Sequence, residues 1–492
     1  MQIFLSLLLA GFIGGYLGSL ILRRLREPLQ AVIEQAEAIM GRRFVTIPEP
    51  RVPELRRLAI AMNDTVARLK AMFDEEALRL SEVRREANFD PLTSLANRPF
   101  FMARLEDALE TEESASGTLM LVRIADLAGI NQRLGRAATD ELLRRLAKTM
   151  ATFVERHGDG LAARLNGADF ALLLPPQPQA LKSAEELLDA LGQEALPYLG
   201  GTPVAFIGVG HFSHGIEKGS LLSQVDAALA SAQATGTSTA HEAAVSDDTE
   251  IPRSAEQWAR QLRQALDNRW VRLISFPVND FHGQLIHWES PLRLRLEQDG
   301  EWLPAGRFLP MAERLRLTPA LDFAAARLGV EELERHPELP GLAINLSASS
   351  IHEAEFRDDL KNLLKEHPAA AARLWLEIAE VGAFRHLEDF RQFVGAVNST
   401  GCRIGLEHFG RQFSQIGHLH DLGLDYLKVD ASFIRDLDNS PGNQSFLRGL
   451  ATLSHGIGLM VIGEGIMNEA ELDTLQTLGF DGITGPAVTP PA

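Results

Sequence analysis

The chain has 492 residues, which is more than one ordinary domain needs and predicts two or more domains. Its formal net charge of −18 disfavours direct binding of nucleic acid, because contacts to a phosphate backbone need clusters of Lys and Arg. A single cysteine, Cys402, excludes an internal disulfide bond and a cysteine-based zinc site.

The first 22 residues contain no charged side chain and are largely apolar, about the length that crosses the core of a bilayer. Arg23, Arg24 and Arg26 follow directly, and the positive-inside rule places that end of the segment in the cytoplasm. We therefore expect residues 1–22 to form one transmembrane helix, with the bulk of the chain cytoplasmic. Because the apolar run begins at residue 1, we expect no sensor domain ahead of it.

Residues 23–87 contain two segments with apolar residues at helical spacing, separated by a stretch with three prolines. In the second segment the apolar positions are Leu55, Leu58, Met62, Val66 and Leu69. Two amphipathic helices joined by an extended connector resemble a HAMP relay, and the alternative is a plain coiled-coil stalk. Either structure predicts a homodimer, because an exposed apolar stripe must be buried against a partner.

The stretch NFDPLTSLANRPFF, which begins at Asn88, resembles the start of a GGDEF domain, the fold of diguanylate cyclases. The order expected of that α/β fold follows, with LMLVRI as a strand, a helix that ends in LLRRLAKTM, and AARLNGADFALLLP as a strand hairpin. We assign residues 88–240 to this domain. The polar residues 241–252 are expected to form a linker to the next domain.

The resemblance implies a cyclase site that has lost its chemistry. The family hairpin has two glycines that let the backbone approach GTP, followed by two acidic residues, but here it is NGADF, with Asn166 and Ala168 at altered positions. Only Asp169 remains of the acidic pair. On the preceding strand Arg123 and Ala125 replace acidic residues, and a cation at that position repels Mg²⁺. We therefore predict no cyclase activity.

Eight short apolar runs occupy the C-terminal half, with helix-like segments between most of them. The runs are VRLISFPV, LIHWESPLRL, LAINLSAS, LWLEIAE, CRIGLEHFG, YLKVD, MVIGEG and FDGITG. This alternation predicts a parallel (β/α)8 barrel, in which the carboxyl ends of the strands share one mouth. Polar residues at the ends of six runs are expected to line it: Glu289, Asn345, Glu377, Glu407, Lys428 and Glu464. Such a group of carboxylates needs a counter-ion, most simply Mg²⁺ or Mn²⁺.

The same segments resemble the EAL family, whose barrel binds and usually hydrolyses cyclic di-GMP. ESPLR stands at the position of the EAL motif, and FLPMAE, INLS, LEIAE, KVD and GEG match further family segments in order. The resemblance assigns residues 253–492 to an EAL domain. It implies metal ligation by Glu289, Asn345 and Glu377, and by a following aspartate pair that is Glu407 and His408 here.

The altered pair puts metal binding and hydrolysis in doubt, because Glu407 is one methylene longer than Asp and His408 is a softer ligand, suited to Mn²⁺ or Zn²⁺ rather than Mg²⁺. Lys428, supported by Asp430, and Glu464 are retained at the positions that carry catalysis in the family. The second glutamate that should follow Glu464 is Met467. We therefore expect a weak or absent metal site.

Ligand-binding positions are better preserved. The resemblance makes Arg293 a phosphate clamp and leaves Glu289 and Asp430 at the ligand, while Glu380 steadies the loop that contains the altered pair. The glutamine that contacts ligand in the family is Phe276 here. Because catalysis tolerates displacement less than binding does, we favour a cyclic di-GMP receptor over a phosphodiesterase that forms pGpG.

The whole layout is similar to the LapD group, receptors of the bacterial inner membrane with degenerate GGDEF and EAL domains that relay cyclic di-GMP binding through HAMP. We expect this chain to differ from that group in having no first membrane helix and no periplasmic domain, which leaves its output open. We expect an unknown protein partner. A further alternative is a CsrD-like adaptor that directs RNA turnover by recruiting a protein.

Overall fold

The computed structural model describes residue 26 and residues 29–36, 44–111, 116–200, 202–243, 255–411 and 413–490. The predicted transmembrane segment, residues 1–22, lies outside these ranges. Within them, no helix combines the length and the apolar character that crossing a bilayer requires.

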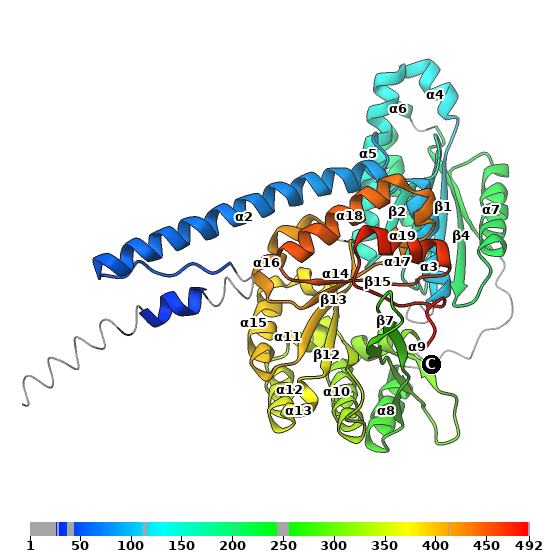
Figure 1. Cartoon of the computed structure of the whole chain (residues 1–492). Coiled ribbons are helices and arrows are strands. Elements are labelled where there is room, and N and C mark those ends of the chain that lie inside the picture. Colours follow the sequence, from blue (N-terminus) through cyan, green and yellow to red (C-terminus); the bar gives the residue numbers. More distant parts are fainter. Residues whose placement is uncertain are drawn as a thin grey trace, which may run out of the picture.

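The N-terminal part contains two helices and an extended connector. Residues 29–36 are helical, residues 44–52 are extended, and α2 runs over Pro53–Asn88. The connector lies along α2 (Figure 1), because the Asn63 side chain accepts from the backbone N–H of Ile47 at 3.1 Å and donates to its carbonyl at 2.9 Å. Gln35 also donates to Asn63 at 2.9 Å, so one asparagine joins all three segments.

The second half of α2 packs on the barrel of the same chain. Phe73, Ala77 and Leu80 are buried, and Leu80 contacts helix α18 (Pro441–Gly456) so closely that a Cβ at Gly449 would lie 2.5 Å from it. The apolar stripe that we expected to need a partner chain is therefore covered in part by the chain itself. Intramolecular packing fixes this contact, and spacing along one helix does not reveal it.

The middle domain is an α/β layer structure. Its elements are α3 (Arg98–Glu110), β1 (Ser116–Ile124), α4 (Leu127–Leu134), α5 (Arg136–His157), β2 (Leu161–Arg164), β3 (Asp169–Leu174), α6 (Ala180–Leu199), β4 (Ala205–Ser213), α7 (Lys218–Ala234) and β5 (Thr239–Glu242). The strands form one sheet in the order β2-β3-β1-β4-β5. Strand β5 continues through Glu242, so the sheet extends two residues into the segment that we predicted to be linker.

Both faces of this sheet are covered by helices. Leu119 and Leu121 belong to the core that includes α3 and α7, whereas Met120 and Val122 belong to the core that includes α5 and α6. Successive side chains of a strand point to opposite faces, so the central strand β1 must be apolar at every one of these positions. The continuous run LMLV meets that requirement.

The C-terminal domain is a closed barrel in the order β11-β12-β13-β14-β15-β16-β7-β8. The strands are β7 (Phe276–Asn279), β8 (Leu285–Glu289), β11 (Leu342–Leu346), β12 (Leu374–Ala379), β13 (Arg403–Phe409), β14 (Tyr426–Val429), β15 (Met460–Gly463) and β16 (Gly482–Ile483). The α-helices are α8 (Ala255–Asp267), α9 (Ala305–Arg314), α10 (Thr318–Arg335), α11 (Ala348–His352), α12 (Ala354–Glu366), α13 (Pro368–Ala371), α14 (Glu380–Arg385), α15 (Leu387–Val397), α16 (Leu419–Leu422), α17 (Ala431–Ile434), α18 and α19 (Glu469–Leu478).

The prediction of an all-parallel barrel is wrong at one strand. Strand β7 pairs antiparallel with both β8 and β16, whereas the other neighbouring pairs are parallel. The cause is the short turn between β7 and β8. The backbone N–H of Asp280 donates to the carbonyl of Gln284 at 2.8 Å and closes this turn, in which Gly283 has φ 76°. So few residues join only antiparallel strands, since a parallel pair needs a crossover of about a dozen residues.

Two of the apolar runs are also divided between two sheets. Strands β6 (Val271–Leu273) and β9 (Leu292–Leu294) form a side sheet with β10 (Leu303–Pro304), in the order β10-β9-β6. The runs VRLISFPV and LIHWESPLRL therefore each supply one strand to the barrel and one to this sheet.

Candidate functional site

Polar side chains from six barrel strands meet at the mouth of the barrel, around the ammonium of Lys428. Its Nζ lies 3.0 Å from Glu289, 3.0 Å from Glu377 and 3.5 Å from Glu464. Both Lys428 and Glu377 are buried. The six strand-end residues that the sequence places at one mouth are thus brought together, and an internal cation balances part of their charge.

This arrangement fixes the charge of the buried groups. Burial opposes ionisation of Glu377, but the nearby Lys428 ammonium outweighs it and lowers the pKa of that carboxyl to about 2. Burial likewise opposes the charged form of Lys428, yet Glu289 and Glu377 raise its pKa well above the usual value. The lysine is therefore protonated at every physiological pH and acts as a fixed positive charge.

The altered pair Glu407 and His408 lies at an irregular end of β13. The register of β13 on β14 shifts between Leu406 and Phe409, and His408 has φ 52°, in the left-handed region. Its Nδ1 lies 3.0 Å from Glu464, so the ring turns toward β15. Non-glycine residues are uncommon in this region and are concentrated at functional sites, where the surrounding contacts hold them.

The donor set at the mouth fits one divalent ion better than two. Mg²⁺ and Mn²⁺ prefer oxygen donors, which are offered here by Glu289, Asn345, Glu377 and Glu407. Asn345 Nδ2 donates a hydrogen bond to the Glu407 carboxylate at 2.9 Å. A second ion would need both carboxylates of the family's aspartate pair. One of those two positions is His408 here, and its ring is paired with Glu464. A bound ion here would supply charge for a phosphate group, but the residues do not match a two-metal centre that activates water.

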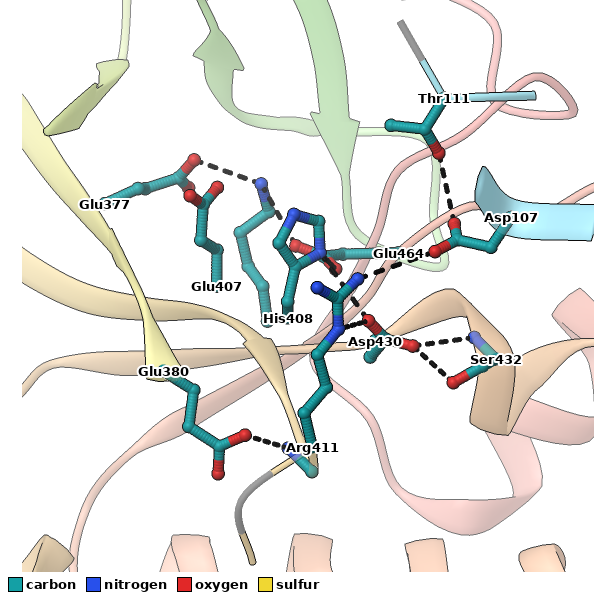
Figure 2. Close-up of polar contacts among 12 residues, drawn as sticks. Asp107, Thr111, Glu377, Glu380, Glu407, His408, Arg411, Asp430, Ser432 and Glu464 are labelled. Atoms are coloured by element: carbon teal, nitrogen blue, oxygen red, sulfur yellow. Dashed lines mark hydrogen bonds and ion pairs between the residues drawn. The ribbon is translucent and has the colours of Figure 1, made fainter. Parts of the chain in front are cut away.

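Asp430 connects the mouth to the middle domain. Arg411 Nε lies 2.6 Å from the Asp430 carboxylate (Figure 2). Arg104 of α3 reaches the same carboxylate at 3.2 Å. Ser432 donates to the other oxygen of the Asp430 carboxylate, from its backbone N–H at 3.0 Å and from its hydroxyl. Burial opposes ionisation of Asp430, but Arg411 and Arg104 lower its pKa below the ordinary range. The residue expected to support Lys428 and to lie at the ligand is thus the centre of an interdomain ion-pair network.

The network continues through a second aspartate on α3. Asp107 lies 3.0 Å from Arg104 and 3.5 Å from Arg411, and it accepts from the Thr111 hydroxyl at 3.1 Å. Burial and the neighbouring Asp430 raise the pKa of Asp107, while the two arginines oppose that rise. We call Arg104, Asp107, Arg411 and Asp430 the interdomain ion cluster.

Glu380 holds the loop after β13, as the resemblance implies. Its Oε2 accepts from the backbone N–H of Gly410 at 3.1 Å, and both groups are buried. Gly410 has φ 112°, and a Cβ there would lie 2.7 Å from the Phe433 ring, so only glycine fits this position. One buried carboxylate therefore fixes the turn between His408 and Arg411.

The remaining predicted ligand residues lie on β7 to β9. Arg293 is 5% exposed, on β9 directly after the end of β8. Phe276 faces Glu289 in the register of β7 on β8 and is 44% exposed, while Met467, which follows Glu464 by three residues, is 38% exposed. The two substitutions noted in the sequence thus present apolar groups where the family has polar ones.

The cyclase-like hairpin has an ion pair where a metal would need carboxylates. Arg123 and Asp169 are opposite one another on β1 and β3, and their side chains pair at 2.5 Å and 3.2 Å. Burial opposes ionisation of Asp169, but Arg123 and Asn166 lower its pKa. Asn166 donates to Asp169 at 2.6 Å and accepts from the N–H of Ala168 at 3.2 Å, which closes the turn. Ala125, by contrast, contributes no polar side chain.

Several residues of the site were not found from the sequence. Arg104, Asp107 and Arg411 make up most of the interdomain ion cluster, yet each is one of many charged residues in helices or loops. Tyr426 donates to Glu377 at 3.1 Å, and His287 lies 3.8 Å from the same carboxylate. The inward side of a barrel strand gives a signal for Tyr426 and His287, because both are polar residues within apolar runs, but no local pattern marks the other three.

Comparison with known proteins agrees with this description. Residues 87–239 match the diguanylate cyclase GGDEF domain, and residues 259–491 match the EAL domain. An uncharacterized protein of Mycobacterium tuberculosis is 29% identical over 422 residues, which are 82% of this chain and 66% of that protein. Cyclic di-GMP phosphodiesterase PdeB of Shewanella oneidensis is 25% identical over 442 residues, which are 87% of this chain and 50% of PdeB. The chain therefore spans between 50% and 66% of these two relatives.

Among solved structures, the apo S helix–GGDEF–EAL structure of Vibrio cholerae LapD has a TM-score of 0.77 at 24% identity, covering 85% of this chain and 99% of that one. That similarity concerns the fold, including a long helix ahead of the two domains. The family matches and the fold agree on the order of the parts: the chain belongs to the proteins in which a GGDEF domain is followed by an EAL domain.

Proposed function

We propose that this protein is a cyclic di-GMP receptor, in which the EAL barrel binds the ligand and the GGDEF domain senses that binding. One observation supports this proposal above the others. The loop at the end of β13 supplies Glu407 and His408 to the mouth and, two and three residues later, Gly410 to Glu380 and Arg411 to the interdomain ion cluster. A ligand that displaces this loop therefore acts on the contact between the domains.

Two cationic side chains are available to the ligand, although carboxylates outnumber them at the mouth. Cyclic di-GMP has two phosphates, and Lys428 together with Arg293 would supply permanent positive charge to bind them. Its guanine bases are flat and apolar on their faces, and Phe276 is 44% exposed beside Glu289, where a base can stack on its ring. Binding thus needs only groups that the chain retains.

Hydrolysis has weaker support. An attacking water would need two metal ions or a strong base, whereas His408 and Glu464 are bonded to each other and Lys428 is locked between glutamates. Met467 offers no proton acceptor. We therefore assign slow turnover or none, with one Mg²⁺ or Mn²⁺ as an optional aid to phosphate binding.

The relay would run through α3 and α2. Helix α3 belongs to the GGDEF domain and makes the ion pairs to Asp430, while α2 leads toward the N-terminus and packs on α18 (Figure 1). If residues 1–22 anchor the protein in a membrane, as their composition predicts, this path brings the signal to the membrane surface. A protein partner that receives it there completes the proposal.

The proposal is tested by titration calorimetry of the full chain with cyclic di-GMP, followed by analysis of products with Mg²⁺ and with Mn²⁺. We expect binding without appreciable conversion to pGpG. Arg293→Ala should weaken binding roughly ten- to hundredfold, since a charged hydrogen bond contributes about 1.5–3 kcal/mol. Arg403→Ala is the matched control, because Arg403 begins β13 at the opposite end of the barrel and stacks on Trp375 at 4.6 Å.

Two results would overturn the receptor. Turnover near 1 per second or faster would make the protein an ordinary phosphodiesterase. In that case, Glu407→Asp with His408→Asp should raise the rate further. Absence of binding at high micromolar ligand would instead favour a scaffold that recruits a protein, without a nucleotide signal.

A further inference from the structure

Two histidines and an aspartate gather on the outer rim of the EAL barrel, apart from the mouth residues. His352 ends α11, His386 lies between α14 and α15, and Asp389 is in the first turn of α15. Outside the mouth, and among the residues that the structure describes, these three side chains each offer a ligand atom within 4.8 Å of the others. The family roles discussed above use none of them.

The distances suit a shared ion. His352 Nδ1 lies 3.3 Å from Asp389 Oδ2, and one ligand atom from each of the three residues falls within 4.8 Å of the others. Two ligands of a tetrahedral zinc ion, each about 2.0–2.1 Å from the metal, are about 3.3 Å apart. One pair is therefore already at ligand spacing, and the third side chain needs a movement of about 1 Å.

The ring of His352 is also left without the hydrogen bond that a buried nitrogen normally has. Its Nδ1 is inaccessible to solvent and makes no hydrogen bond, although it faces Asp389. The two imidazole rings meet edge to face with their centroids 4.5 Å apart. The nearby cation Arg357 points elsewhere, because its Nη1 donates to the backbone carbonyls of Ile351 and His352 at 2.9 and 3.1 Å.

We propose that His352, His386 and Asp389 bind one transition-metal ion, with Zn²⁺ the best fit. Imidazole and carboxylate ligands suit zinc, and three protein ligands leave a fourth position for water or for a group from another molecule. The site is independent of the proposed receptor function, since it contains no residue of the mouth.

The ion would join two segments that begin at the mouth. Helix α11 follows β11, which contains Asn345, and helix α14 follows β12, which contains Glu377. These helices already touch, because a Cβ at Gly382 of α14 would lie 2.5 Å from that of Ala348 in α11. A metal bridge from His352 to His386 would fasten the far ends of the same two helices.

The test is a titration of the metal-free full chain with Zn²⁺ against a chromophoric chelator, in excess Mg²⁺ so that the mouth is offered its preferred ion. Co²⁺ then serves as a spectroscopic probe of coordination. We expect one equivalent of Zn²⁺ to bind, with a Co²⁺ spectrum typical of tetrahedral nitrogen and oxygen ligands. His386→Gln and Asp389→Asn should each weaken binding at least about tenfold, because even changes beyond the first ligands cost 10–100-fold.

Controls separate this site from other histidines and from the mouth. His367→Gln removes a histidine that pairs with Glu334 at 2.6 Å and is not part of the three-residue group, and it should leave binding unchanged. Glu377→Gln alters the mouth and should also preserve the Co²⁺ spectrum. His386 is exposed, so its substitution should not impair folding, which circular dichroism would verify.

The proposal is wrong if the wild-type chain binds no Zn²⁺ tighter than about 100 µM, or if His386→Gln and Asp389→Asn bind it as tightly as the wild type. It is equally wrong if Glu377→Gln abolishes the Zn²⁺ site while the two rim variants retain it. Each of these outcomes is independent of whether cyclic di-GMP binds.

Discussion

Arg123 occupies a position where the GGDEF family has an acidic metal ligand, and the fold around it is intact. Its guanidinium pairs with Asp169 and donates to Gln233 at 3.1 Å, inside a cavity of about 350 Å³ that also includes Asn166. A cation now satisfies the carboxylate that a metal would need. The two partly exposed charges compensate one another, so the domain has an ion pair where a cyclase has a reactive centre.

From this we expect no cyclic di-GMP from GTP with Mg²⁺ or Mn²⁺, measured by chromatography of the products. A chain with Arg123→Asp, Ala125→Asp and Ala168→Glu together should still fail, because Asn166 closes the hairpin turn with two hydrogen bonds and narrows the phosphate approach. Product from the wild type would contradict the assignment. Product from the triple variant alone would mean that the turn is not the obstacle.

The pair Glu377 and Lys428 predicts a pH dependence of stability. The folded-state pKa of Glu377, about 2, lies below its ordinary value of 4.5. The ionised carboxylate therefore contributes to the free energy of unfolding above pH 4.5, and this contribution is lost as the pH falls toward 2. We expect the free energy of unfolding in urea to fall over that window, and Glu377→Gln to flatten the fall. At pH 7 the same variant should lose roughly 3 kcal/mol. Glu366→Gln, on an exposed position of α12, should retain the wild-type slope.

At the level of residues, the sequence identified the mouth because parallel strands present their carboxyl ends at one edge, so one polar residue near the end of each of six runs was enough. It did not identify the left-handed conformation of His408, which depends on a bulge and on Glu464. Nor did it identify Arg104, Asp107 or Arg411, because an ion pair between two domains leaves no spacing that a single segment displays.

Among the elements, the apolar face of α2 is covered by the barrel along only part of the helix. Phe73 and Leu80 pack on the barrel, whereas Leu58, on the same face nearer the N-terminus, is 46% exposed. A helical stripe predicts that a face will be buried but not by which partner. The exposed part of this face is the one that still needs a second chain.

We therefore expect a parallel dimer, detectable by light scattering of the chain from Pro28 onward at micromolar concentration. Leu58→Lys with Met62→Lys should dissociate it, because each lysine would enter an apolar contact without a counter-charge. Glu76→Lys, an exposed position on the same helix, is the control and should leave the dimer intact. A wild-type chain that is strictly monomeric would refute the predicted dimer.

Strand β7 shows why an element can be predicted and its direction missed. Its run is apolar like the others, and periodicity does not distinguish a parallel strand from an antiparallel one. The information lies in the connection, where Asp280 and Gly283 close a turn. Loop length and turn residues between runs would have indicated a hairpin.

For the whole molecule, the interdomain ion cluster predicts that domain docking and ligand binding are linked. If the docked arrangement is one of two states, weakening it should favour the other by the free energy removed. Arg104→Ala should therefore raise the affinity for cyclic di-GMP about five- to tenfold, within the usual range of coupling between sites. Small-angle scattering should show a larger radius of gyration before ligand is added.

The matched control is Arg133→Ala, which removes an exposed pair with Asp126 at 3.5 Å on α4, away from the barrel. This variant should change neither the affinity for cyclic di-GMP nor the radius of gyration. An Arg104→Ala chain with unchanged affinity and a larger radius would mean that docking and binding are independent. Weaker binding would mean that Arg104 contacts the ligand.

The closure of the barrel through β7 also affects how the chain is made. Strand β7 pairs with β16 at Asn279 and Ile483, so the ribosome must deliver almost the entire domain before the ring can close. The GGDEF sheet, in contrast, is complete once Glu242 has emerged. At about 5–20 residues per second, translation from Glu242 to Ile483 takes roughly 12–50 s. During that interval Phe73 and Leu80 have no barrel to cover them, so the nascent chain exposes apolar side chains that we expect chaperones to bind.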